Sequence, residues 1–325
     1  MADKKRIFIL GSGFSKSFSA KMPTMNDLTE RLFALNHEEF KTLTQFVQNI
    51  YQKSNELDEF RSIENIANII FSKRIFRNFE EEMDYEKLKF ELIKFIYKEI
   101  QKQEIDRNKA DTLYQFILNC SNDPRANKHD LIFNFNYDLI IEDLLNLKQE
   151  KHIELSYGLK FERYDTQNES ALKAPKKGTL ELLKLHGSFN WFRAKGSESN
   201  DIRNIYLLHK TDPMYTIHSN DIPTYIPMTN VKALFLTGTL YNTLWSKAVE
   251  HLNECDEIIF IGYGFPHTDL NNLSLFLDYK EKIRYINIKK GQGIHKLDRL
   301  YQMFGQEVIY NMDAKNFIEQ KILQG

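Results

Sequence analysis

The sequence predicts an α/β protein: a Rossmann-like parallel sheet with helices on both faces and an all-helical insertion after the first strand. Two observations support this. Short apolar runs recur along the chain and end in glycine or polar residues, as buried parallel strands do. Helical periodicity fills most of the segments between them, and strands that alternate with helices form parallel sheets. The expected strands are 6–10, 131–135, 182–185, 257–261, 283–288 and 307–310.

After the first strand, residues 26–125 show helical spacing of apolar residues and almost no strand signal. We interpret this stretch as the helical insertion, and Asn26-Asp27-Leu28 offers a cap for its first helix. The Rossmann-like core then consists of residues 1–25 and 126–325, and the whole chain, 1–325, is expected to form a single domain.

In the core, helices are expected at 139–147, 231–252 and 269–277, with a short helical tail at 314–323. Right-handed crossovers between parallel strands place the loops that follow the strands at the carboxyl edge of the sheet, where α/β proteins bind ligands. Residues 196–227 are polar and punctuated by proline, and we interpret them as an active-site flap.

Composition restricts the class of protein. The 325 residues carry a formal net charge of -1, so no global basic field indicates direct binding of nucleic acid. The two cysteines, Cys120 and Cys255, are not part of a Cys-x-x-Cys pair, which argues against a zinc knuckle or a disulfide framework. No apolar run approaches the ~20 residues of a membrane span, and no signal peptide is recognisable. We therefore expect a cytoplasmic protein without membrane contact.

Two glycine-containing loops follow strands. In Gly11-Ser12-Gly13-Phe14-Ser15, two glycines allow the backbone to approach a pyrophosphate. The third glycine of the dehydrogenase fingerprint is replaced by Lys16, which disfavours hydride transfer. Gly262 and Gly264 could line the same diphosphate path. The alternative for both loops is a tight strand exit without a ligand.

Three polar residues also follow strands. The Asn136 amide can hold a carboxamide or a water, because it both donates and accepts hydrogen bonds. Asp138 is better placed to cap the helix that begins near residue 139. His186, in Leu185-His186-Gly187, can act as a base near neutral pH, although a single histidine is often structural. Ser188 and Asn190 either orient His186 or line the pocket.

These motifs, in this order, resemble the sirtuin (silent-information-regulator) family of NAD-consuming enzymes. The resemblance extends from about residue 7 to residue 288. It pairs the first glycine loop with the family's cofactor loop, Asn136-Tyr137-Asp138 with its nicotinamide pocket and His186-Gly187 with its catalytic pair. Gly262-Tyr263-Gly264 takes the place of its second glycine loop, and Asn287 matches an asparagine that meets the adenosine ribose.

The resemblance implies that NAD is the substrate and that His186 and Asn136 are catalytic. It implies cofactor-binding roles for Gly11, Ser12, Gly13, Phe14, Ser15, Asp138, Gly262, Gly264 and Asn287. Protein-deacetylating sirtuins carry glutamine where this chain has Phe135, and they usually carry four zinc-binding cysteines. These departures favour NAD hydrolysis to nicotinamide and ADP-ribose, with no zinc or other metal.

The same departures resemble the sirtuin-like NADases of bacterial antiphage (abortive infection) defence. That resemblance implies control by homo-oligomer assembly or by a partner sensor subunit: a helicase-like ATPase, an argonaute or a nucleotide-sensing protein. Two alternatives stay open. One is a non-catalytic regulatory subunit that binds NAD or ADP-ribose, and the other is an NAD-dependent protein deacylase.

Overall fold

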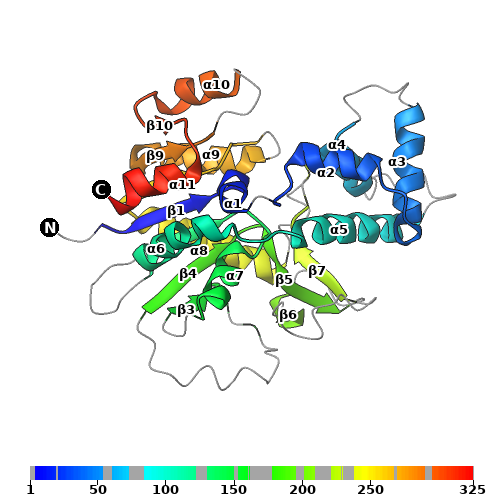
Figure 1. Ribbon diagram of the computed structural model, residues 1–325, viewed down its shortest axis with the longest axis horizontal. Helices are drawn as coiled ribbons and strands as arrows, with labels where there is room; N and C mark the ends of the chain where they lie inside the picture. The colour runs from blue at the N-terminus through cyan, green and yellow to red at the C-terminus, as the bar shows by residue number, and fades with distance from the viewer. Residues whose placement is uncertain are drawn as a thin grey trace.

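The structure of the chain is a computed structural model. It describes residues 4–19, 21–53, 61–72, 84–121, 130–149, 153–159, 161, 178–194, 201–208, 221–227, 229, 238–266, 269–289 and 295–324. Figure 1 shows a sheet with its helices on one side of the molecule and a group of helices, α2 to α5, on the other side.

Seven parallel strands form the main sheet, in the order β10-β9-β8-β1-β2-β4-β3. Central β1 is apolar because both of its faces are covered, and Ile7 to Leu10 are fully buried. The chain runs from β1 to β2 on one side and later to β8 on the other, so the strand order changes direction around β1. The bounds are β1 Arg6–Leu10, β2 Leu131–Asn134, β3 Ile153–Ser156, β4 Gly178–Lys184, β8 Glu257–Ile261, β9 Ile283–Asn287 and β10 Ile309–Tyr310.

Helices cover both faces of this sheet, which confirms the predicted Rossmann-like class. Phe8 of β1 packs edge-on against Phe116 of α6. Phe260 of β8, beside Ile9 in the register, packs against Phe276 of α9 on the opposite face. The helices of the core are α1 Ser12–Phe18, α6 Ala110–Cys120, α7 Ile140–Leu147, α8 Thr239–Glu254, α9 Leu270–Asp278, α10 His295–Phe304, α11 Ala314–Phe317 and the π-helical turn η11 Ile318–Leu323.

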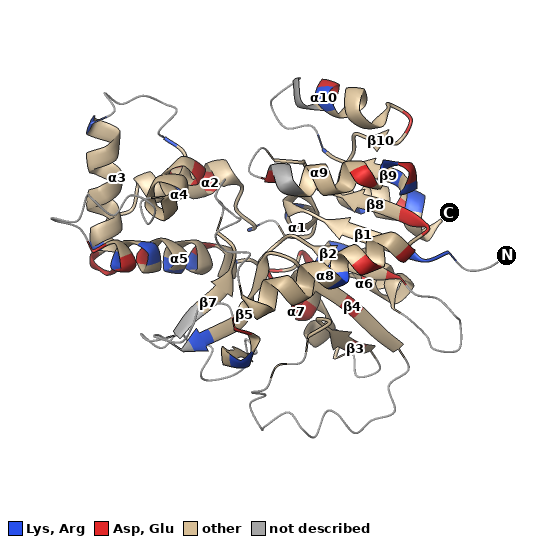
Figure 2. Ribbon diagram, turned by 180° about the vertical axis from the view of Figure 1, so that it is seen from behind, with Lys and Arg blue, Asp and Glu red and all other residues tan. Residues whose placement is uncertain are grey.

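The described part of residues 26–125 contains helices and the short connections between them, and no strand. Its first helix begins at Met25, before the predicted cap Asn26, because Thr24 is the cap. Thr24 and Asp27 form a reciprocal capping box. Figure 2 shows acidic and basic residues interspersed along α5. The elements are α2 Met25–Phe33, η1 Glu38–Phe40, α3 Lys41–Lys53, α4 Ile63–Ser72, α5 Tyr85–Gln101 and η4 Arg107–Lys109.

A second, antiparallel sheet of three strands was not predicted. Its strands are β5 Gly187–Ala194, β6 Ile205–Leu207 and β7 Asp221–Tyr225, in the order β6-β5-β7, preceded by η6 Ile202–Asn204. The described parts of residues 196–227 thus include two strands of this sheet, and their role as an active-site flap stays a prediction. Residues 196–200 and 209–220 lie outside the described residues.

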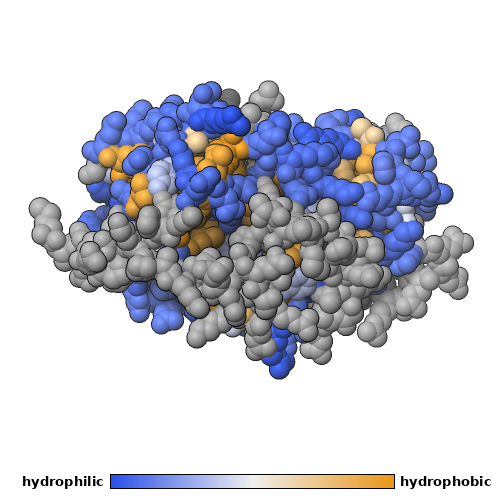
Figure 3. Space-filling view, turned by 60° about the horizontal axis from the view of Figure 1, so that its bottom comes forward, coloured by the Kyte–Doolittle hydropathy of each residue, from blue (hydrophilic) through white to orange (hydrophobic). Residues whose placement is uncertain are grey.

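On the face that Figure 3 shows, the described residues are mainly hydrophilic, and apolar side chains gather in recesses between them. None of the helices in the described part of the chain combines the length and the apolarity that a membrane span requires.

Candidate active site

Four loops at the carboxyl edge of the main sheet meet around one cavity of about 330 Å³. Ligand cavities in proteins have volumes of roughly 300–1,000 Å³, so this one is at the lower end of that range. The predicted residues that line it are Gly11, Ser12, Gly13, Ser15, Asn136, Asp138, His186 and Gly264. Parallel strands bring these loops together although they are far apart in the sequence.

Asn136 is held by two hydrogen bonds that use both of its amide hydrogens. Its Nδ2 donates to the Gly11 carbonyl oxygen at 2.9 Å and to Ser15 Oγ at 2.9 Å. Rotating the amide would place Oδ1 against the Gly11 carbonyl oxygen, and two acceptors repel each other. Asn136 lines the cavity, so Oδ1 is the atom that it can offer to a ligand.

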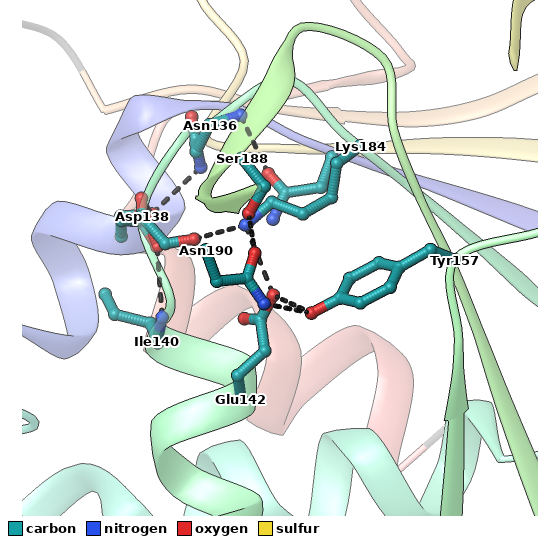
Figure 4. Close-up of polar contacts among 10 residues, drawn as sticks. Asn136, Asp138, Ile140, Glu142, Tyr157, Lys184, Ser188 and Asn190 are labelled. Atoms are coloured by element: carbon teal, nitrogen blue, oxygen red, sulfur yellow. Dashed lines mark hydrogen bonds and ion pairs between the residues drawn. The ribbon is translucent and has the colours of Figure 1, made fainter. Parts of the chain in front are cut away.

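Asp138 completes this hydrogen-bond chain (Figure 4). Ser15 Oγ donates to Asp138 Oδ2 at 2.6 Å, and Asp138 Oδ1 accepts from the backbone N–H of Ile140 at 3.2 Å. The second contact reaches the first residue of α7, but the N-cap of that helix is Leu139 and has no side-chain cap hydrogen bond, so Asp138 is not the predicted cap. Burial raises the pKa of Asp138, whereas the Lys184 charge and the Ser15 hydrogen bond oppose the rise.

His186 lies in the turn between β4 and β5, and its side chain is almost fully buried. The Phe135 ring meets the imidazole edge-on at 4.9 Å between ring centroids. Asn272 Nδ2 lies 3.5 Å from His186 Nε2. Gly187 permits the sharp turn, because its φ of +84° is one that L side chains rarely adopt.

Ser188 and Asn190 do not line the cavity, contrary to one of the two roles considered for them. Ser188 Oγ donates to Asn190 Oδ1 at 2.6 Å, and Asn190 Nδ2 donates to the Tyr157 hydroxyl at 2.9 Å. Both side chains therefore belong to a buried network behind the cavity wall.

The two glycine loops pack against each other, and this packing explains their glycines. Gly13 N donates to Gly262 O at 2.9 Å. Gly262 has φ +64°, and a Cβ there would lie 2.1 Å from Phe14 N. This packing supports the alternative explanation of the glycines, a tight strand exit without a ligand. Gly11 and Gly13 also line the cavity, as a ligand-binding loop would.

Three predicted cofactor-binding residues do not line the cavity: Phe14, Gly262 and Asn287. Phe14 is a core residue. Asn287 is fully buried, with Oδ1 accepting from Gly262 N at 3.2 Å and Nδ2 donating to Met312 O at 2.9 Å. Its side chain supports the second glycine loop, and its contact with a ribose stays a prediction.

The sequence did not indicate that the helical stretch forms one wall of the cavity. That wall comes from the segment leading into α2, from α4 and from α5. The residues are Met22, Pro23, Thr24, Met25, Leu28, Glu64 and Ile100. The Thr24–Asp27 capping box was visible in the sequence, but its position beside the sheet edge is a long-range feature that no local pattern shows.

Comparison with known proteins finds a family match for the central part of this chain. Residues 130–282 match the family model of the SIR2-like domain. The match spans Asn136, Asp138, His186 and Gly262, and it ends before Asn287. Residues 130–282 are therefore similar to the SIR2-like domain, as the motifs in this part of the chain indicated.

Several solved structures are similar at low identity. A structure on the mechanism and regulation of Sir2 enzymes is 12% identical with a TM-score of 0.45, and the match covers 98% of this chain and 90% of that one. A Sir2 homolog–NAD complex has the same identity and TM-score, with 98% and 88% covered.

One curated protein is also similar over a short segment. The DNA-directed RNA polymerase subunit Rpo11 of Korarchaeum cryptofilum (strain OPF8) is 36% identical over 73 residues. These residues make up 22% of this chain and 74% of that protein, so the similarity concerns a small part of the structure described above.

Proposed function

We propose that this protein is an NAD+ glycohydrolase that cleaves the nicotinamide–ribose bond. The observation that supports the proposal best is the meeting of His186, Asn136 and the first glycine loop in one cavity at the carboxyl edge of the sheet. In this proposal the diphosphate of NAD lies on the Gly11–Ser15 loop, and the nicotinamide ribose faces Asn136 and His186.

The proposed reaction breaks the bond between the nicotinamide nitrogen and the anomeric carbon. The pyridinium leaves as neutral nicotinamide by taking the bonding electron pair, so it needs no general acid. Water then adds to the oxocarbenium-like ribose, and its proton passes to His186 and on to solvent. The products are nicotinamide, ADP-ribose and a proton. The task of the site is to orient the water and to stabilise developing positive charge.

Asn136 has a defined part in this proposal, because its Nδ2 is already bonded to Gly11 and Ser15 and its Oδ1 is left for a ligand. That oxygen can accept from the attacking water or from the carboxamide N–H of nicotinamide. Phe135 occupies the position of the deacetylases' glutamine and packs against His186. This arrangement supports hydrolysis over transfer to an acyl-lysine.

Asn136→Ala is expected to lose nicotinamide release by about 10²-fold or more, because removal of one oriented polar group has this cost. We expect NAD binding to persist, since the glycine loop is unchanged. Turnover by rapid quench and binding by calorimetry separate the two effects. Asn146→Ala, which removes an exposed asparagine of α7 outside the cavity lining, is the control and should keep wild-type turnover. Loss of NAD binding in Asn136→Ala alone would assign Asn136 to binding instead.

The decisive test of the function is nicotinamide release by the purified protein incubated with NAD. A second reaction with an acyl-lysine peptide separates hydrolysis from deacylation, because a deacylase requires the peptide. Binding of NAD or ADP-ribose without any release would favour the non-catalytic regulatory subunit.

Chelation of zinc is expected to change neither melting temperature nor activity. Structural zinc sites use four Cys or His ligands. Cys120 in α6 and Cys255 after α8 are both buried, and the described residues contain no cluster of three or more His, Cys, Asp or Glu able to hold a metal. Stoichiometric zinc in elemental analysis would contradict this expectation and reopen deacylation.

We further propose a defence role in which activity is gated by homo-oligomer assembly or by a partner sensor subunit. An unrestrained NADase would exhaust the cofactor of its own cell, so resting activity must be low. This part of the proposal is supported by the family resemblance. Full turnover by the isolated monomer, independent of protein concentration, would contradict the gating and leave the chemistry untouched.

A further inference from the structure

A buried lysine lies behind the candidate site, in a place where the proposed chemistry does not use it. Lys184 is the last residue of β4, two positions before His186, and its side chain is completely buried. Lysine is almost never fully buried unless it is paired. The partners of its ammonium group therefore indicate what the residue does.

Lys184 Nζ has two partners, and both belong to the segment that follows β2 (Figure 4). It donates to the backbone carbonyl oxygen of Asp138 at 2.5 Å and to Glu142 Oε1 at 3.3 Å. The first contact ties the strand that carries His186 to the loop that carries Asn136 and Asp138. The ammonium group thus sets the distance between the two parts of the site.

The network extends away from the cavity through Glu142. Glu142 Oε1 also accepts from the Tyr157 hydroxyl at 3.0 Å, which in turn accepts from Asn190. Glu142 Oε2 is buried with no hydrogen-bond partner among the described residues. A buried ion pair that is only partly satisfied contributes little stability and is often replaceable by apolar residues. Stability alone therefore does not explain Lys184.

The charge of Lys184 also acts on the Asp138 carboxylate. An ionised Asp138 can only accept, so Ser15 must donate to it, and the Ser15 oxygen is then left to accept from Asn136. A protonated Asp138 could instead donate to Ser15, and the Ser15 hydroxyl hydrogen would then need another acceptor. The charge of Asp138 thus sets the direction of the Ser15 hydroxyl, while the Gly11 carbonyl oxygen holds the Asn136 amide.

We propose that Lys184 is the positioning residue of this site: its ammonium group fixes the Asn136–Asp138 loop against the strand that carries His186. The hydrogen-bond chain from Asn136 through Ser15 to Asp138 is thereby held in one direction. Lys184 itself does not line the cavity and touches no reacting atom.

The direction of the expected pH effect follows from the charges around Asp138. Lys184 from β4 lowers its pKa, Glu142 from α7 raises it, and burial raises it most. His186, Lys16, Glu64 and Asp269 are the other ionisable groups that share the cavity lining besides the tyrosines. Activity that requires ionised Asp138 is lost as the pH falls through the Asp138 pKa. Removing Lys184 raises that pKa, so the acid limb of the profile of kcat against pH moves to higher pH.

The test compares Lys184→Met, Lys184→Arg and Glu142→Gln in the full chain. A neighbouring unit charge shifts a carboxyl pKa by about 1–3 pH units, so Lys184→Met should move the acid limb of kcat upward by about that amount. Lys184→Arg keeps the charge and should restore the wild-type limb. Glu142→Gln removes the opposing charge and should move the limb to lower pH. A uniform loss of activity at every pH would indicate a merely structural role and overturn the proposal.

The kinetic readout rests on the proposed function, so a second readout is independent of activity. NMR titration of the Asp138 side-chain carbonyl carbon gives the protonation midpoint of Asp138 directly. This measurement needs no turnover of NAD. Absence of nicotinamide release would then defeat the proposed function, while the midpoints still decide the role of Lys184. If Lys184→Met does not fold, the test rests on Glu142→Gln, in which the titration midpoint of Asp138 should fall. An Asp138 midpoint that does not change in this variant overturns the proposal.

Discussion

His186→Ala is expected to lower nicotinamide release by about 10²–10⁴-fold, which is the usual cost of losing a general base. The structure shows that the ring also packs against Phe135, so some stability should be lost as well. Single substitutions commonly cost about 0.5–3 kcal/mol, and the variant should remain folded. Steady-state turnover and thermal unfolding, measured on the same preparation, separate the two effects.

His37→Ala is the matched control for this experiment. His37 is exposed, caps η1 by accepting from Glu39 N, and lies outside the cavity lining. Its removal should leave turnover unchanged. A folded His186→Ala protein with wild-type turnover would remove His186 from the catalytic assignment.

Gly262→Ala is expected to have the largest effect on stability, a loss of more than about 3 kcal/mol. A left-handed conformation costs an L residue about 1–2 kcal/mol. The new Cβ would in addition lie 2.1 Å from Phe14 N and 2.5 Å from the Gly13 carbonyl carbon, so the backbone itself must move. Because the first glycine loop lines the cavity, ligand binding should fall with stability. Urea unfolding and binding calorimetry measure both.

Gly305→Ala separates backbone strain from steric conflict. Gly305 also has a positive φ, of +87°, but a Cβ there meets only the flexible carboxylate of Glu307. It should cost about 1–2 kcal/mol, the conformational part alone. Equal losses in the two variants would show that the contact between the glycine loops does not constrain Gly262.

The main sheet could be predicted from the sequence because its strands are covered on both faces. The strands at 6–10 and 257–261 are continuous apolar runs with clear ends, and the structure reproduces both predicted ranges. The signal for β3 was weaker, since its four residues are all only half-buried at the sheet edge.

The second sheet was missed for an identifiable reason. Pro223 lies inside β7, and proline was taken as a mark of a loop. Proline is tolerated on edge strands, and β7 is an edge strand of the β6-β5-β7 sheet. The alternation of Phe189 and Trp191, both buried, was the available sign of β5.

The part of the candidate site at the sheet edge was visible in the sequence. The loops that follow β1, β2, β4 and β8 converge because parallel topology requires it. The wall contributed by α2, α4 and α5 depends on how a remote helical stretch folds over the edge of the sheet. Lys184 was likewise read only as part of an apolar strand, although a charge in such a strand indicates a buried partner.

The position of β1 has a consequence for the newly made chain. Ile7 is synthesised before both of its neighbours in the sheet, Leu131 and Ile258. At ribosomal rates of about 5–20 residues per second, an apolar strand waits on the order of ten seconds or longer for its second partner. The cavity needs the same late segment, because the Gly262 loop holds the Gly13 loop in place. A nascent chain therefore cannot complete this cavity before the Gly262 loop has been translated.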